Sequence, residues 1–161
     1  AFRPVQKRER PDFDAQQWEI LPEYLLVDGY NIIFAWDELN ALAKDSLEAA
    51  RHKLMDILCN YQGYQGCRLI LVYDAYKVKD NPGSTMKYHN IEVVYTKEAE
   101  TADQYIERTT HQLGAKPQKY RVTVATSDAL EQMIIWGNGA TRMSALGLKA
   151  AVEAAGAEYF K

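Results

Sequence analysis

Residues 24–31 read YLLVDGYN, a short apolar run that ends abruptly in an aspartate and a glycine. Continuous apolar runs of this length are typical of strands that are buried on both faces of a parallel sheet. Three later segments have the same character, and each also stops at a polar residue. The sequence therefore predicts three further buried strands, at residues 69–73, 91–95 and 122–125.

Segments with helical spacing of apolar residues separate or follow these strands. They predict helices at residues 46–61, 101–113, 129–136 and 145–155. Thr101 and Gln104 form a capping-box pattern, Ser127 can cap the third helix, and Gly156 is expected to end the last one. Residues 77–87 contain the sequence NPGS and are expected to form a mobile loop. Alternating strands and helices predict a mostly parallel sheet covered by helices on both faces.

The length of 161 residues suits one α/β domain. Residues 1–22 hold three prolines and little periodicity, which predicts a linker or surface arm before a domain at residues 23–161. The first residue is Ala1, which fits a fragment of a longer protein or removal of an initiator methionine. No apolar run has the length of a membrane span and no signal peptide is visible, so we expect a cytoplasmic protein.

Charge and metal-binding residue types narrow the function classes. The formal net charge is -3, which is unusual for a nucleic-acid-binding protein but compatible with a site that needs several carboxylates. The two cysteines form no CxxC pair, and the three histidines are scattered. A structural zinc site is therefore not expected, and the cysteines are expected to be reduced.

The acidic residues follow the predicted strands. Asp28, Asp74 and Asp128 come at or just after the ends of three strands, and Asp103 lies in the first turn of a predicted helix after Glu100. Right-handed crossovers bring the carboxyl ends of parallel strands to one edge of the sheet. We therefore expect these acids to converge at that edge.

A divalent cation would make such a cluster stable. Each aspartate alone could simply cap a helix or begin a turn, but several close carboxylates repel one another. Oxygen ligands suit Mg²⁺ or Mn²⁺, and the chemistry that follows is hydrolysis of a phosphodiester by a metal-activated water. Asn31 could orient a ligand or contact substrate, with a role in the turn as the alternative. Ser127 could support the metal ligands, with helix capping as the alternative.

Several motifs resemble one known family. Residues 26–31 (LVDGYN), 72–75 (VYDA), 96–103 (TKEAETAD) and 124–128 (VATSD) are similar, in order and spacing, to the YacP-like NYN branch of the PIN-like ribonucleases. The small-residue segment 137–144 fits the same pattern. The resemblance covers nearly the whole predicted domain.

The resemblance implies a three-layer PIN-like α/β fold with central strand order 3-2-1-4. It also implies an endoribonuclease that depends on Mg²⁺ or Mn²⁺ and cleaves messenger RNA in connection with the ribosome. By motif match, Asp28, Asp103 and Asp128 would be the metal ligands, and Asp74 and Glu100 supporting acids. The arm at residues 1–22 faintly resembles a connector to a translation-factor-like GTPase.

RNA would need positive groups around this acidic edge. The candidates are Lys77, Lys79, Lys97 and Arg142, with ordinary solvated surface as the favoured alternative for any single lysine. A Rossmann domain is disfavoured because no GxGxxG follows the first strand, and a haloacid-dehalogenase-like phosphatase because Tyr30 stands where a second aspartate is needed. The rival that stays open is a non-catalytic module that binds RNA or the ribosome.

Overall fold

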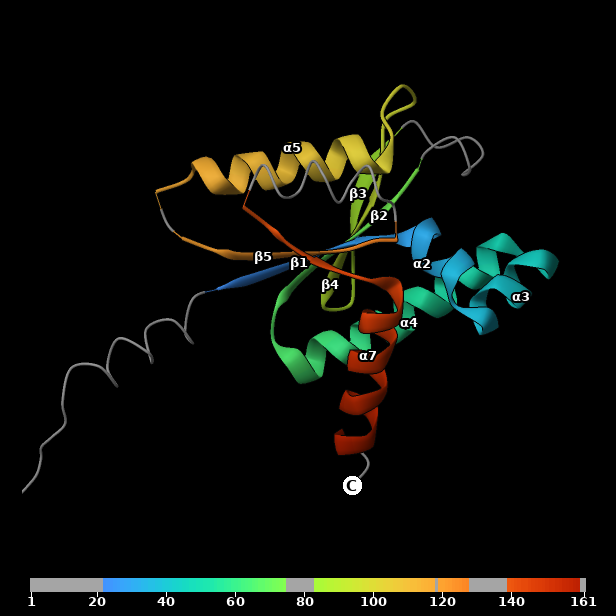
Figure 1. The fold of residues 1–161 in the computed structure, drawn as a ribbon. Coiled ribbons are helices and arrows are strands. Elements are labelled where there is room, and N and C mark those ends of the chain that lie inside the picture. The colour runs from blue at the N-terminus through green and yellow to red at the C-terminus, as the bar shows by residue number, and fades with distance from the viewer. Residues whose placement is uncertain (1–21, 75–82, 118, 128–138, 160–161) are drawn as a thin grey trace, which may run out of the picture.

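The computed structural model describes residues 22–74, 83–117, 119–127 and 139–159. They form an α/β fold around one six-stranded, mostly parallel sheet with helices on both faces (Figure 1). The strands are β1 (Glu23–Asp28), β2 (Arg68–Tyr73), β3 (Ser84–Tyr88), β4 (Ile91–Tyr95), β5 (Arg121–Ala125) and β6 (Thr141–Met143). The helices are α2 (Gly29–Ala35), α3 (Asp37–Asp45), α4 (Leu47–Gln65), α5 (Ala102–Ala115) and α7 (Ala145–Tyr159).

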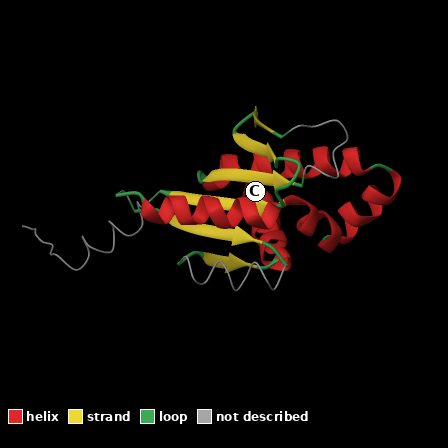
Figure 2. Cartoon of the chain, turned by 90° about the horizontal axis from the view of Figure 1, so that it is seen from above, coloured by secondary structure: helices red, strands yellow, loops and turns green. Residues whose placement is uncertain are grey.

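The strand order is β3-β4-β2-β1-β5-β6. The four strands predicted from sequence are β1, β2, β4 and β5, and they lie next to one another in the predicted order 3-2-1-4. The full order differs from this prediction because a further strand joins each side. Strand β3 pairs antiparallel with β4, and β6 pairs parallel with β5. Figure 2 shows the strands side by side as one twisted layer.

The sheet separates two apolar cores, as the continuous apolar runs predict. Along β1, Leu25 and Val27 join the core beneath α2, α4 and α7, whereas Tyr24 and Leu26 join the core beneath α5. Successive side chains of a strand point to opposite faces, so every residue of this run has an apolar environment. The helices are distributed in the same way, with α5 on one face and α4 and α7 on the other (Figure 1). The three-layer fold class is confirmed.

Three of the predicted helices form, as α4, α5 and α7, with small changes at their ends. Ser46 caps α4, accepting a hydrogen bond from the backbone of Ala49 at 3.0 Å, and the capping box of Thr101 and Gln104 starts α5. The expectation that Gly156 ends the last helix is wrong, because α7 continues to Tyr159. A Cβ placed on this glycine would meet nothing within 4 Å, so the position does not need glycine.

Some elements are not expected from the sequence. Helices α2 and α3 were not predicted, and part of the predicted loop 77–87 is instead strand β3. The predicted helix 129–136 and residues 1–21 of the predicted arm lie outside the described residues. No described helix combines the length and the apolar character that crossing a membrane requires.

Candidate active site

The carboxyl ends of the parallel strands form one edge of the sheet, here called the carboxyl edge. Asp28 is the last residue of β1 and pairs in register with Val72 of β2, and Val27 pairs with Ala125 of β5. Asp74 and Ser127 follow these two neighbouring strands by one and two residues. The topology therefore brings three of the predicted polar positions to the same edge.

The chain turns from β1 into α2 without any intervening loop, and Gly29, the first residue of α2, leaves room there for the Tyr73 ring. A Cβ on Gly29 would lie 2.3 Å from Cε1 of Tyr73, whose fully buried ring packs against the start of α2. A side chain there could be accepted only if the ring moved. The glycine of the DGYN motif is thus explained by close packing of strand β2 against the turn.

Asp28 does not serve as a helix cap. It occupies the N-cap position of α2, yet its side chain makes no capping hydrogen bond, and it is only 6% exposed. Burial of a carboxylate is costly, so a position that does not use it for capping is typical of a functional site.

Asn31 links Asp28 to the end of β5. Its Nδ2 lies 3.5 Å from Oδ2 of Asp28, a long donor-to-acceptor distance. Its Oδ1 accepts hydrogen bonds from the backbone N–H of Ser127, at 2.8 Å, and from the Ser127 hydroxyl. This side chain therefore ties the first and fourth predicted strands together beside the buried carboxylate, although 96 residues separate Asn31 from Ser127.

Asp74, in contrast, has a helix-capping role. Its Oδ1 accepts a hydrogen bond from the backbone N–H of Ala102, the first residue of α5, at 2.5 Å. This bond fixes the start of α5 above the end of β2. Asp103 lies in that first turn and accepts a hydrogen bond from the Thr101 hydroxyl. The cap on α5 therefore also brings Asp103 towards the carboxyl edge.

The other predicted acids are placed differently. Glu100 forms an ion pair with Arg108 at 2.9 Å, on the exposed side of α5. Within the described residues, no group of three or more His, Cys, Asp or Glu side chains is placed to hold a metal ion. Asp128, the third ligand that the resemblance implies, lies outside the described residues, as do Lys77 and Lys79.

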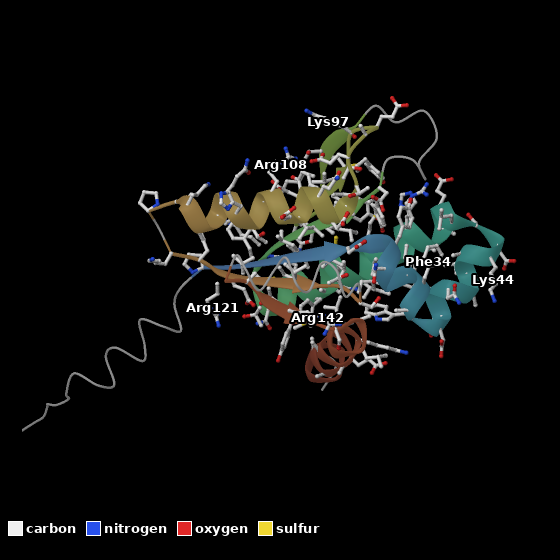
Figure 3. The ribbon with its side chains drawn as sticks, turned by 45° about the horizontal axis from the view of Figure 1, so that its top comes forward. Phe34, Lys44, Lys97, Arg108, Arg121 and Arg142 are labelled. Atoms are coloured by element: carbon white, nitrogen blue, oxygen red, sulfur yellow. The ribbon has the colours of Figure 1, made fainter. Side chains whose placement is uncertain are left out.

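Two predicted basic residues are described and labelled in Figure 3. Lys97 is exposed just after β4. Arg142 lies on β6 beside Val124, and its buried Nε has no hydrogen-bond partner among the described residues. Lys97 follows the end of β4, which lies at the carboxyl edge. Arg142 pairs with Val124, one residue before the end of β5, and so lies near the same edge.

A basic residue that the sequence analysis missed lies near the same edge. Arg51, in the second turn of α4, donates a hydrogen bond from Nη1 to the Tyr30 hydroxyl at 3.3 Å. Its backbone carbonyl accepts a hydrogen bond from the hydroxyl of Tyr73 at 3.1 Å. Helix α4 leads into the start of β2, so it begins near the carboxyl edge. A helix that precedes a parallel strand begins near the carboxyl edge. A charged residue in the first turns of such a helix, like Arg51, could therefore have been chosen as a candidate from the sequence.

The tyrosines around Arg51 form a packed aromatic cluster. The ring of Tyr73 lies 5.0 Å from that of Tyr30 and 5.7 Å from that of Tyr95, between ring centroids. Burial raises the pKa of all three hydroxyls. Arg51 partly offsets the rise in the pKa of Tyr30 and Tyr95 through its charge and a hydrogen bond to each. The negative charge of Asp74 also raises the pKa of Tyr30, which indicates that the cluster lies within range of the acidic residues.

Residues 25–160 match the model of the YacP-like NYN domain. The protein YacP of Bacillus subtilis is 44% identical over 131 residues, which cover 81% of this chain and 75% of that protein.

Solved structures give the same result for the fold. A crystal structure of Rae1 (YacP) from Bacillus subtilis is 40% identical, with a TM-score of 0.71 over 85% of this chain and 77% of that one. A structure of a point mutant of Rae1 is 41% identical, with a TM-score of 0.72 over 84% and 78% of the two chains. On sequence and fold together, the chain belongs to the family of YacP-like NYN domains.

Proposed function

We propose that the chain is a metal-dependent endoribonuclease whose active site is the carboxyl edge of the sheet. Membership of the YacP-like NYN family supports a nuclease-type role that acts on RNA. The observation that carries the finer proposal is Asp28, a buried carboxylate at the end of the central strand that makes no capping hydrogen bond. A purely structural aspartate at this position would cap α2.

The residues at this edge fit a hard divalent cation. Their donor atoms are carboxylate, amide and hydroxyl oxygens, the set that Mg²⁺ and Mn²⁺ prefer. Asp28, Asp103 and Asp128 would hold the ion, with Asp74 or Glu100 assisting through water. When bound, the ion would lower the pKa of an attacking water and neutralise charge on the phosphate.

The chain's own side chains set up this chemistry. Asn31 holds the Asp28 carboxylate against the end of β5, and Asp74 fixes the helix that carries Asp103. Hydrolysis forms a bond between a water oxygen and phosphorus and breaks the bond from phosphorus to the 3′ oxygen, which takes up a proton. The products are a 3′-hydroxyl and a 5′-phosphate.

The second candidate is a non-catalytic module that binds RNA or the ribosome. The pairing of Glu100 with Arg108 and the capping role of Asp74 favour it, since both acids have structural partners. The ribosome context and the connection to a GTPase stay predictions from the sequence.

The test is cleavage of labelled single-stranded RNA, and of messenger RNA on translating ribosomes, with and without Mn²⁺. Asp28→Asn and Asp103→Asn are expected to lower the cleavage rate by about two to three orders of magnitude while circular dichroism shows an unchanged fold. Asp45→Asn, an exposed acid at the end of α3, is the matched control and should cleave normally. Products that end in a 2′,3′-cyclic phosphate would contradict the hydrolytic mechanism. Intact binding without any cleavage would favour the non-catalytic module.

A further inference from the structure

The described arginines differ in whether a carboxylate forms an ion pair with them. Arg108 pairs with Glu100 and Arg121 with Glu23, whereas no carboxylate among the described residues forms an ion pair with Arg51. Glu48, one turn earlier on α4, is near enough to raise the pKa of Tyr95 but does not pair with Arg51. Among the described residues the guanidinium is bonded to tyrosine hydroxyls, so no described carboxylate cancels its positive charge by direct contact.

Tyrosine hydroxyls hold both the guanidinium and the backbone of Arg51 in place. The Tyr30 hydroxyl accepts from Nη1, the Tyr95 hydroxyl lies beside the guanidinium, and the Tyr73 hydroxyl bonds the backbone carbonyl of Arg51. A guanidinium has five N–H donors, and the two hydroxyl acceptors among the described residues engage only part of them. Donors that are fixed before a ligand arrives cost little entropy when the ligand binds.

The position is suited to a phosphate. Arg51 is partly buried near the carboxyl edge, where Asp74 acts on Tyr30, the residue that Arg51 contacts. The acids of that edge repel an RNA strand, so a fixed cation beside them is needed to hold its backbone. Guanidinium groups bind phosphate oxygens through paired, charge-assisted hydrogen bonds.

We propose that Arg51, oriented by Tyr30 and Tyr95, binds a backbone phosphate of the RNA strand beside the scissile bond. This inference rests on the proposed nuclease function and names a substrate-binding residue for it. It also explains how a chain with a net charge of -3 holds a polyanion at an acidic edge.

The experiment measures binding of labelled single-stranded RNA in the Asp28→Asn background, which keeps the strand intact. Arg51→Gln is expected to weaken binding by about tenfold to a hundredfold, the range for a hydrogen bond to a charged group. Between about 50 and 200 mM KCl, the slope of log K against log salt should become shallower by about 0.7, because one phosphate contact is lost. Arg51→Lys should keep that slope while losing part of the affinity, since it keeps the charge but not the fork of donors.

The chain offers a matched control. Arg68 at the start of β2 also donates to a tyrosine hydroxyl, that of Tyr24 at 3.2 Å, but at the opposite edge of the sheet. Arg68→Gln should change neither affinity nor slope. If Arg51→Gln lowers only the unfolding temperature and leaves both binding readouts as in the parent, Arg51 is a structural tie and the inference is overturned.

Two further outcomes keep the inference separate from the proposed function. Binding that depends on Arg51, in a chain that never cleaves RNA in the wild-type form, supports the phosphate contact and overturns the nuclease. Cleavage by the wild type together with unchanged binding by Arg51→Gln does the reverse. Should Arg51→Gln fail to fold, Tyr30→Phe removes one orienting hydroxyl, and a loss of about twofold to tenfold is expected; unchanged binding by that variant contradicts the proposal.

Discussion

Strand β1 begins with the carboxylate of Glu23 and ends with that of Asp28, and the two carboxylates differ in burial and in their partners. At the amino edge, where the parallel strands begin, Glu23 lies 3.9 Å from Arg121, and both side chains are partly exposed. At the carboxyl edge, Asp28 is buried and held by Asn31. Figure 3 shows Arg121 at one end of the sheet and Phe34 of α2 beyond the other.

Arginine and tyrosine show the same contrast. Arg68 and Tyr24 meet at the amino edge, where Arg68 is exposed and also lies over the Tyr24 ring. Arg51 and Tyr30 meet beside the carboxyl edge within a packed aromatic cluster. The same residue types thus form a contact with an exposed arginine at one edge and a contact with a partly buried arginine at the other. Residue type alone does not identify the site; burial and topology do.

The two ends of β1 give the largest expected effect. Asp28→Asn should lower the rate of RNA cleavage by about two to three orders of magnitude, as for loss of one group that stabilises developing charge. Glu23→Gln should leave the cleavage rate unchanged, because Glu23 lies at the opposite edge and its exposed ion pair with Arg121 contributes little to stability. Initial rates on one labelled RNA, with equal folding checked by circular dichroism, make the comparison. Equal cleavage rates in the two variants would contradict the proposal that the active site lies at the carboxyl edge.

Glycines at the two edges give the next effect, on stability. Gly29→Ala should lower the free energy of unfolding by about 1–3 kcal/mol, because the new Cβ overlaps the Tyr73 ring. Gly66→Ala, at the end of α4, should cost about 1 kcal/mol for another reason: its φ is +78°, and a Cβ would meet nothing. Urea denaturation measures both. The cost of Gly29→Ala should shrink when Tyr73 is also replaced by leucine, and a cost that stays the same would show that the ring is not the obstacle.

The contrast between the edges also explains what the sequence could predict. Strands β1, β2, β4 and β5 were predicted because burial on both faces leaves a continuous apolar run. Strand β3 was missed because its side chains are mostly exposed and it becomes a strand only by pairing with β4. Strand β6 has three residues, which is too short for any periodicity.

The site was predictable where topology determines it and not where side-chain packing does. Asp28 ends β1 and Asp74 follows β2, so the parallel order alone places them at one edge. Asp28, which caps nothing, and Asp74, which caps α5, could not be told apart without the hydrogen bonds. Arg51 was missed because its relevance depends on how α4 packs against the tyrosines.

Substitutions of Asp74 should have a smaller effect on stability, and they separate a role in capping α5 from a role in assisting a bound metal. Asp74→Ala removes one hydrogen bond to the first turn of α5, in addition to which the Thr101 capping box remains, and should cost about 1 kcal/mol in the free energy of unfolding. Asp74→Asn keeps an oxygen acceptor and should cost less than about 0.5 kcal/mol. If capping is its whole role, Asp74→Asn cleaves RNA normally; if it also assists a bound metal through water, this variant is stable but cleaves slowly. Chemical denaturation and initial rates on the same samples distinguish these cases.

The last expected effect lies at the amino edge and appears only at alkaline pH. Burial, and more weakly the charge of Glu23, raises the pKa of the Cys67 thiol to about 11 from a usual 9.0. The unfolded chain therefore loses this proton at a lower pH than the folded chain, so the free energy of unfolding should fall as pH rises from about 9 to about 11. Tyr30, Tyr73 and Tyr95 act in the same direction at the carboxyl edge, so the wild type alone cannot isolate the thiol. Cys67→Ala should show the shallower decline in urea titrations at several pH values, with a constant difference from the wild type below pH 8. Parallel curves up to pH 11 would assign the whole alkaline loss to other groups, the tyrosines of the carboxyl edge among them.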